Sequence, residues 1–273
     1  MEEKRNGKSW TISDELWERV KDEIPATKGR DPEREYKHRP GQGRKRLDSR
    51  KVLSGIFYVL RTGCQWKAVP AEFGSGSSLH RYFQEWEKAG FFRKIWAMAL
   101  EEYDDLKGIG WEWQSVDGSM VNAPLAQDAT GPNPTDRGKM GTKRSVLSDG
   151  HGLLLGVVLD GANRHDSKLL EDTLDDIVLA RPEVTEEYPQ NLCLDAGYTG
   201  KQEAVTYRHY KPHIVSRREE KKQKEKNPDF KARRWVIEVL HSHMNRFRKL
   251  LVRYEKKANN YLALIHFACA VIV

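Results

Sequence analysis

The sequence predicts an α/β protein in which a helical N-terminal region precedes a mixed sheet flanked by helices. Before residue 110, apolar residues recur at helical spacing in four segments. From Trp111 onward, short runs rich in β-formers alternate with helical segments, in the order strand, strand, strand, helix, strand, helix, strand, helix. That order favours a mixed sheet with helices packed on it. We therefore expect two domains, a helical one over residues 1–110 and an α/β one over residues 111–273.

Four helices are expected in the first domain, because polar capping residues precede the apolar repeats and Gly or Pro follows most of them. The third helix carries His80, Arg81 and Gln84 on its polar face, as the recognition helix of a helix-turn-helix domain would. A generic helical bundle with a solvated face is an equally good interpretation. Residues 26–46 lack apolar periodicity and indicate a flexible basic linker. The expected helices cover residues 13–25, 48–63, 77–90 and 91–103.

The second domain is expected to contain a hairpin, crossover helices and a long final helix. Residues 149–152 read Asp-Gly-His-Gly, a strong turn signal between two β-rich runs. Asp166 or Ser167 should cap a helix that ends before Pro182. An apolar stripe of helical period runs from Val236 to Leu251 and predicts one helix over residues 233–254. The expected strands cover residues 113–121, 144–148, 153–160, 192–195 and 213–216.

Charge is distributed unevenly around a net charge of +7. The middle of the chain is acidic and its last part strongly basic, which suits a polyanion held by one surface while acidic groups elsewhere gather cations. Acidic membranes attract basic patches too, but no apolar stretch reaches the roughly 18 residues of a spanning helix. The N-terminus lacks the apolar core of a secretory signal, and the three cysteines are isolated. We expect a reduced, cytoplasmic protein with no membrane partner.

Three carboxylates fall where an RNase H-like sheet would need metal ligands. Asp117 lies in the first strand, Asp195 closes the strand after the first crossover helix, and Glu238 lies on the final helix. In an RNase H-like sheet those three positions converge on one edge. Carboxylates that hold two hard divalent cations can activate a water or hydroxyl and stabilise the leaving oxygen of a phosphodiester.

Taken one at a time, each of these carboxylates has an ordinary structural explanation. Asp117 and Asp195 each precede a glycine closely and could simply form turns. Glu238 could pair with Arg234 at helical spacing. Glu238, however, shares its helix face with cations and hydrogen-bond donors that suit flanking phosphates. The joint placement of the three acids, rather than any one of them, favours a catalytic site.

A set of motifs, in a fixed order, covers nearly the whole chain from about Trp17. They are Gly43-Arg44 with Asp48-Ser49-Arg50, Leu60-Arg61-Thr62-Gly63-Cys64-Gln65-Trp66 with Val69-Pro70, Ser115-Val116-Asp117-Gly118-Ser119, Asn163-Arg164-His165-Asp166-Ser167, Asp195-Ala196-Gly197-Tyr198, and Arg234-Trp235-Val236-Ile237-Glu238 running into Asn245-Arg246-Phe247-Arg248-Lys249. The ordered set resembles the DDE-type bacterial insertion-sequence transposases, in the group named after insertion sequence five.

This resemblance implies a DNA transposase with Asp117, Asp195 and Glu238 as its metal-binding triad. The implied cofactors are two Mg²⁺ or Mn²⁺ ions in each active site. The implied enzyme binds double-stranded DNA at terminal inverted repeats, cleaves it, and joins the 3′-hydroxyl ends to target DNA. A homodimer holding both ends, associated with the bacterial nucleoid, is expected. A nuclease on the same sheet that never joins strands, and a catalytically silent DNA-binding descendant of a transposase, are the alternatives.

Several residues are candidates for contacts with DNA. The Tyr/Arg/Glu/Lys signature of related transposases is half present, because Arg234 precedes Glu238 while Lys231 and Asn245 occupy the Tyr and Lys positions. Arg246 or Lys249 is the candidate for the missing cation. The full set of expected DNA contacts is Arg44, Lys45, Arg46, Arg50, His80, Arg81, Gln84, Arg234, His241, Arg246, Arg248 and Lys249.

The adjacent pair His165 and Asp166 also invites a metal or acid-base interpretation. We expect Asp166 to be a helix cap and His165 a loop donor instead. Of the two histidines on the final helix, only His241 shares the face of Glu238, since His243 is two residues away.

Overall fold

The computed structural model describes residues 10–26, 45–215, 225–226 and 235–273. Most of the expected basic linker lies outside these residues. The first helices are α1 (Asp14–Val20), followed by the 3-10 turn η1 (Lys21–Glu23), then α2 (Ser49–Thr62), α3 (Gly76–Lys88) and α4 (Phe91–Lys107). Ser13 caps α1 and Asp48 caps α2, as expected, while α3 begins earlier than expected and is capped by Ser75. The helical N-terminal region is thus confirmed.

The connection between α2 and α3 differs from that of a simple helix-turn-helix. Residues 63–75 contain two 3-10 turns, η2 (Trp66–Ala68) and η3 (Ala71–Phe73), whereas the motif joins its helices by a turn of about three to four residues. Gly63 adopts φ 72° at the end of α2, a left-handed conformation suited to glycine. The structure therefore has the expected helices with a longer connection between them.

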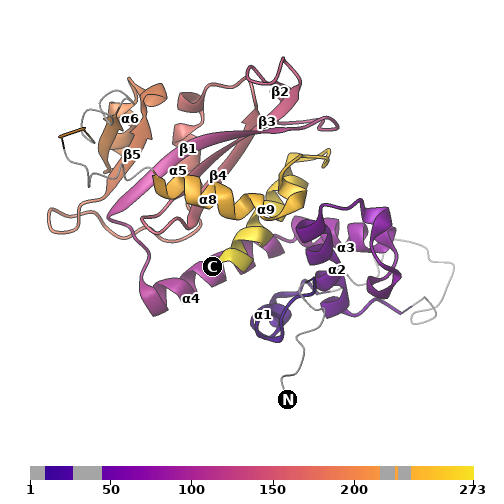
Figure 1. Cartoon of the computed structure of the whole chain (residues 1–273). Coiled ribbons are helices and arrows are strands. Elements are labelled where there is room, and N and C mark those ends of the chain that lie inside the picture. Colours follow the sequence, from indigo (N-terminus) through magenta and orange to yellow (C-terminus); the bar gives the residue numbers. More distant parts are fainter. Residues whose placement is uncertain (1–9, 27–44, 216–224, 227–234) are drawn as a thin grey trace, which may run out of the picture.

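The sheet has the strand arrangement of the RNase H-like fold. Its strands are β1 (Trp113–Asn122), β2 (Gly131–Pro132), β3 (Met140–Ser148), β4 (Leu154–Gly161), β5 (Asn191–Asp195) and β6 (Lys211–Val215). β3 pairs antiparallel with both β1 and β4, whereas β5 pairs parallel with both β1 and β6. β2 is a short addition, unexpected from the sequence, that also pairs with β3. The mixed α/β fold is confirmed, with β1 in the middle of the sheet (Figure 1).

The remaining helices are α5 (Leu170–Asp175), α6 (Gln202–Tyr207), α8 (Trp235–Asn245) and α9 (Ala258–Ile272). The single long helix expected over residues 233–254 is wrong, because α8 ends at Asn245 and is followed by the 3-10 turn η6 (Arg248–Leu250). The chain then turns toward the sheet, where Val252 forms a parallel bridge to Asn122 and the Arg253 N–H donates to the Asn122 carbonyl at 2.8 Å. Leu251, the last member of the predicted stripe, is consequently 46% exposed.

Helix α9 packs against the N-terminal helices although it lies at the other end of the chain (Figure 1). The Phe267 ring lies 5.9 Å from that of Phe57 in α2 and 5.5 Å from that of Phe92 in α4. The buried apolar side chains of the helices and of the sheet form one cluster.

The domain boundary predicted near residue 110 falls between α4 and β1, and whether the two parts fold separately stays a prediction. No helix in the described part of the chain is long and apolar enough to cross a membrane.

His266 makes the stability of this helical packing depend on pH. Its ring stacks on Trp96 at 4.9 Å, and burial lowers the pKa of His266 to about 3, with Arg93 contributing. The unfolded chain, with a histidine pKa near 6.5, therefore binds a proton that the folded chain excludes. This histidine costs stability as pH falls from about 6.5 toward 3, by about 1.4 kcal/mol per pH unit.

We expect His266→Phe to reduce this dependence, because phenylalanine can keep the stacking without titrating. Urea unfolding of both proteins at pH 6.5, 5.5 and 4.5 measures it. As pH falls, the unfolding free energy of the variant should rise relative to that of the wild type. A constant difference would contradict the prediction.

Candidate active site

The pairing of β1 with β5 aligns the two strands that carry Asp117 and Asp195. The parallel register matches Trp113 with Asn191 and Ser115 with Cys193. Continued by two residues, the same register sets Asp117 beside Asp195. Neighbouring strands are about 4.8 Å apart, and matched residues face the same side of a sheet. Both carboxylates are half-buried, so the end of β5 presents a pair of acids on one face.

The turn-forming interpretation of these acids is also partly correct. Asp117 Oδ1 accepts a hydrogen bond from the Gly118 N–H at 2.8 Å. Asp195 Oδ1 accepts one from the Gly197 N–H at 2.8 Å, which caps the short 3-10 turn η5 (Ala196–Tyr198). These local bonds orient the two carboxylates.

Helix α8, which carries Glu238, packs on β1 and β3 (Figure 1). One turn further along α8, His241 Nε2 lies 3.9 Å from Asp117 Oδ2. Because Glu238 is three residues earlier, it belongs to the same flank of the helix, and its side chain is exposed. Within the described residues, no three acidic, histidine or cysteine side chains gather closely enough to hold an ion. The fold thus aligns the strands that carry Asp117 and Asp195, and Glu238 lies on the exposed surface of α8.

The electrostatics of this region are dominated by burial and by clustered charge. Burial raises the pKa of the Tyr198 phenol, and the negative charges of Asp166, Asp117 and Asp195 raise it further. Burial, together with the Arg144 charge, lowers the pKa of His241 to about 4. His241 is therefore neutral at physiological pH and can offer a ring N–H without adding charge.

Arg144 is a buried cation beneath the α8 flank. Its guanidinium is 2% exposed, and it donates to Ser119 Oγ at 3.1 Å and more weakly to Asn245 Oδ1 at 3.5 Å. The expected DNA contacts did not include it, because a single arginine within a β-rich run carries no visible sequence signal.

Asp166 is placed differently from the expectation. The side chain of His165, not that of Asp166, accepts from the Ser167 N–H at the start of the 3-10 turn η4 (Asp166–Lys168). Asp166 instead lies against β1 and pairs with Lys143, whose Nζ is 3.0 Å from Asp166 Oδ1. The expected cap is wrong because the imidazole already occupies the capping position.

The candidate DNA contacts near α3 remain a prediction, and the structure shows their surroundings. Arg46 and Arg81 both pair with Glu85, and their guanidinium groups lie 4.8 Å and 5.6 Å from the centre of the Tyr82 ring. Lys45 is exposed, Gln84 is half-buried and Arg50 pairs with Asp14. His80 packs against Trp66, with ring centres 5.0 Å apart, rather than facing outward. Arg44, like Arg234 near α8, lies outside the described residues.

The candidates that follow α8 divide into exposed and buried residues. Arg246 and Arg248 are exposed. Lys249 is 5% exposed and pairs with the equally buried Glu255 at 3.2 Å. As folded, the Lys249 ammonium is committed to this pair, which leaves Arg246 as the better candidate for the missing cation of the signature.

We therefore expect Arg246→Gln and Lys249→Gln to behave differently. Loss of an exposed phosphate contact should lower the slope of log affinity against log salt by about 1. Loss of Lys249 should leave the buried Glu255 carboxylate with the hydrogen bond from Trp66 Nε1 at 3.3 Å but without its cationic partner, and cost about 3–5 kcal/mol of stability. Fluorescence anisotropy of DNA binding at several salt concentrations, together with urea unfolding, separates the two effects. A changed salt slope with unchanged stability for Lys249→Gln would contradict the assignment.

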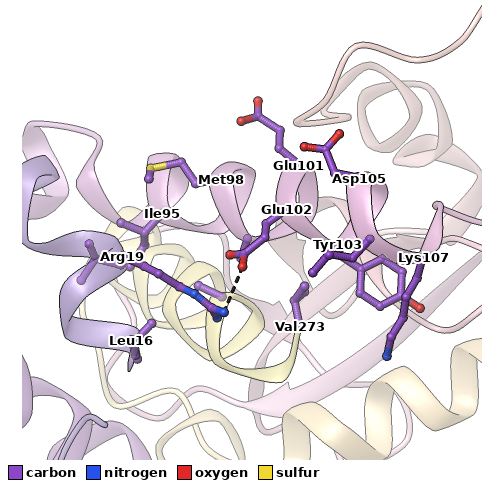
Figure 2. A pocket seen from close by; sticks show the side chains of 14 residues that line it. Leu16, Arg19, Ile95, Met98, Glu101, Glu102, Tyr103, Asp105, Lys107 and Val273 are labelled. Atoms are coloured by element: carbon purple, nitrogen blue, oxygen red, sulfur yellow. Dashed lines mark ion pairs between the residues drawn. The ribbon is translucent and has the colours of Figure 1, made fainter. Parts of the chain in front are cut away.

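One hollow lies between α1, α4 and the end of α9 (Figure 2). It has a volume of about 490 Å³ and is lined by apolar side chains together with the ion pair between Arg19 and Glu102, at 2.9 Å. None of the predicted triad lines it.

Comparison with known proteins assigns the chain to a family. The family described as "Transposase DDE domain" matches residues 114–273, more than half of the chain. The chain belongs to the DDE transposases. A second family, described as a putative transposase of the IS4/5 family, matches residues 12–96 of this DDE transposase.

Individual relatives agree with this assignment. A putative transposase for insertion sequence element IS402 from Burkholderia cepacia is 32% identical over 52% of this DDE transposase and 67% of the relative. An uncharacterised 16.2 kDa protein of the same element is 32% identical over 45% of this chain and 80% of its own length. Among solved structures, the catalytic domain of the Mos1 mariner transposase is a distant match, 11% identical over 57% of this chain and 88% of that chain, with a TM-score of 0.27.

Proposed function

We propose that this transposase cleaves DNA at the terminal inverted repeats of its element and joins the resulting 3′-hydroxyl ends to target DNA, using Asp117, Asp195 and Glu238 and divalent cations. The observation that supports the proposal is the parallel register of β1 against β5, which pairs Ser115 with Cys193 and, continued by two residues, would align Asp117 with Asp195. Two carboxylates on one face of adjacent strands are what a hard dication prefers.

The residues present fit a Mg²⁺ or Mn²⁺ site. Asp117 and Asp195 offer oxygen ligands, and the charges of both carboxylates reach Tyr198, together with that of Asp166. Such mutual proximity of negative charge is unfavourable unless a cation compensates it. Glu238 would complete the ligand set from α8. When bound, a pair of such ions supplies an activated oxygen nucleophile and stabilises the leaving oxygen of the phosphodiester.

The protein's own groups position the DNA. Neutral His241 can donate a ring N–H to a phosphate oxygen near Asp117, and exposed Arg246 and Arg248 lie beyond the end of the same helix. Arg46, which precedes α2, and Arg81 on α3 form a second basic group around Glu85. We propose that α3 holds the repeat while the α8 face holds the cleaved strand, in a homodimer that joins both ends.

The test uses DNA from the flanks of the chain's own genomic locus. Incubation with Mg²⁺ or Mn²⁺ and strand-specific mapping should show nicks at the repeat ends. Precut end DNA mixed with plasmid should then give joined products. Nicking without joining would identify a structure-specific nuclease, and binding without nicking would identify a catalytically silent DNA-binding protein. Either outcome would overturn the proposal.

A further inference from the structure

Asp166 occupies a space that exists because residue 118 is glycine. A Cβ atom built on Gly118 would lie 2.0 Å from Asp166 Oδ1 and 3.0 Å from its carboxyl carbon. Both distances are too short for any side chain at residue 118 unless Asp166 moves. The carboxylate therefore rests directly on the backbone of β1, one residue after Asp117.

Asp166 and the Asp117 carboxylate lie on opposite sides of this strand. Successive side chains of a strand point to opposite faces, so the position of the missing Gly118 side chain faces away from that of Asp117. Asp166 supports the strand from behind and does not join Asp117 on the face covered by α8. This arrangement distinguishes it from a fourth ligand of the proposed triad.

Lys143 fixes the Asp166 carboxylate in this position. The Lys143 side chain is 6% exposed and the Asp166 side chain 35% exposed, with 3.0 Å between Nζ and Oδ1. Lys143 belongs to β3, next to β1 in the sheet. A buried ammonium needs a nearby negative partner, so the pair ties the start of η4 to the middle of the sheet.

Tyr198 connects this pair to the acids on the other face. The Tyr198 side chain is fully buried, and the charges of Asp166, Asp117 and Asp195 all act on it. The charges of three carboxylates thus act on one buried ring, and Asp166 among them is paired with Lys143. The negative charge of Asp166 would also attract a dication bound near Asp117 and Asp195.

We propose that Asp166 is a positioning residue of the acidic site: held by Lys143 in the space left by Gly118, it fixes the Asp117–Gly118 backbone and adds negative charge that favours binding of a divalent cation. The inference rests on the proposed function, because it acts through Asp117. This role explains why an aspartate follows His165, although His165 itself caps the start of η4.

The first experiment measures Mn²⁺ binding to the full-length protein without DNA, by electron paramagnetic resonance. Asp166→Asn keeps the shape of the side chain and removes its charge. We expect Mn²⁺ affinity to fall about 10- to 100-fold, as for residues that support metal ligands. Asp172→Asn, an exposed aspartate in α5, is the matched control and should change affinity less than twofold. A merely structural residue would lower Tm without this loss of affinity.

The second experiment tests the contact with Gly118 and does not require activity. Gly118→Ala should lower Tm in the wild-type background, because the new methyl group collides with Asp166. In the Asp166→Ala background the collision is removed, so the same substitution should cost much less. Equal costs in the two backgrounds would show that Asp166 does not occupy this space, and would overturn the inference even if Asp166→Asn folds poorly.

Asp117→Asn, measured in parallel, separates the inference from the function on which it rests. If Asp117→Asn abolishes Mn²⁺ binding and nicking while Asp166→Asn binds Mn²⁺ like the wild type, the inference fails and the proposed function stands. If Asp117→Asn binds Mn²⁺ and nicks normally, the proposed site fails and the inference with it.

Discussion

Asp117→Asn should abolish DNA nicking and joining by this transposase while leaving binding to its end DNA intact. The substitution keeps the side-chain volume and removes one oxygen ligand and one negative charge from the pair that β1 and β5 create. Loss of several kcal/mol of transition-state stabilisation corresponds to a rate reduction on the order of 10³-fold or more. Strand-specific gel mapping in Mg²⁺ and in Mn²⁺ measures the rate, and an electrophoretic shift measures binding.

Asp195→Asn should behave in the same way, since it removes the matched carboxylate on the neighbouring strand. Glu238→Gln should also abolish nicking, because it removes the only acid that the described part of α8 contributes. Asp160→Asn, a partly exposed aspartate of β4 that pairs with Arg164, is the matched control and should keep full activity. Metal-dependent nicking that survives any of the three triad substitutions would remove that residue from the site.

The mixed sheet could be predicted because strand order follows from local patterns, and the site on it stays a prediction. Between the β-rich runs around Asp117 and Asp195 lie β2, β3, β4 and the crossover helix α5, after which β5 pairs parallel with β1. To predict that Asp117 and Asp195 lie on neighbouring strands, it was therefore enough to identify the two strands correctly. The position of Asp166 could not be predicted in this way, since it depends on a contact across the sheet with a glycine, and glycine carries no hydrophobic signal.

The end of the last helix also depended on tertiary structure. The spacing of apolar residues from Val236 to Leu251 is compatible with one helix, yet the helix ends at Asn245. The bonds that hold the following segment come from Asn122, Asp128 and Thr142, all more than a hundred residues away in sequence. Long-range hydrogen bonds to a buried arginine outweigh local helical preference.

The second large effect is expected at that arginine: Arg253→Met should lower the unfolding free energy by about 3–5 kcal/mol. Arg253 is fully buried. Its guanidinium bonds to Asp128 Oδ1 at 2.6 Å and Thr142 Oγ1 at 2.8 Å. It also donates to three carbonyl oxygens, those of Ala129, Glu255 and Lys256. Methionine fills much of the volume but leaves these buried acceptors without a donor, and lysine lacks the planar fork that reaches several of them at once.

The matched control is Arg19→Met, which removes an ion pair of similar length on the surface. Arg19 lies 2.9 Å from Glu102, but its side chain is 60% exposed, so the substitution should cost no more than about 1 kcal/mol. Urea unfolding followed by circular dichroism gives both values. Similar losses for the two variants would mean that Arg253 does not hold the segment between α8 and α9 to the sheet. A large loss confined to Arg253 would show that the end of α8 is anchored by a contact that only the complete fold creates.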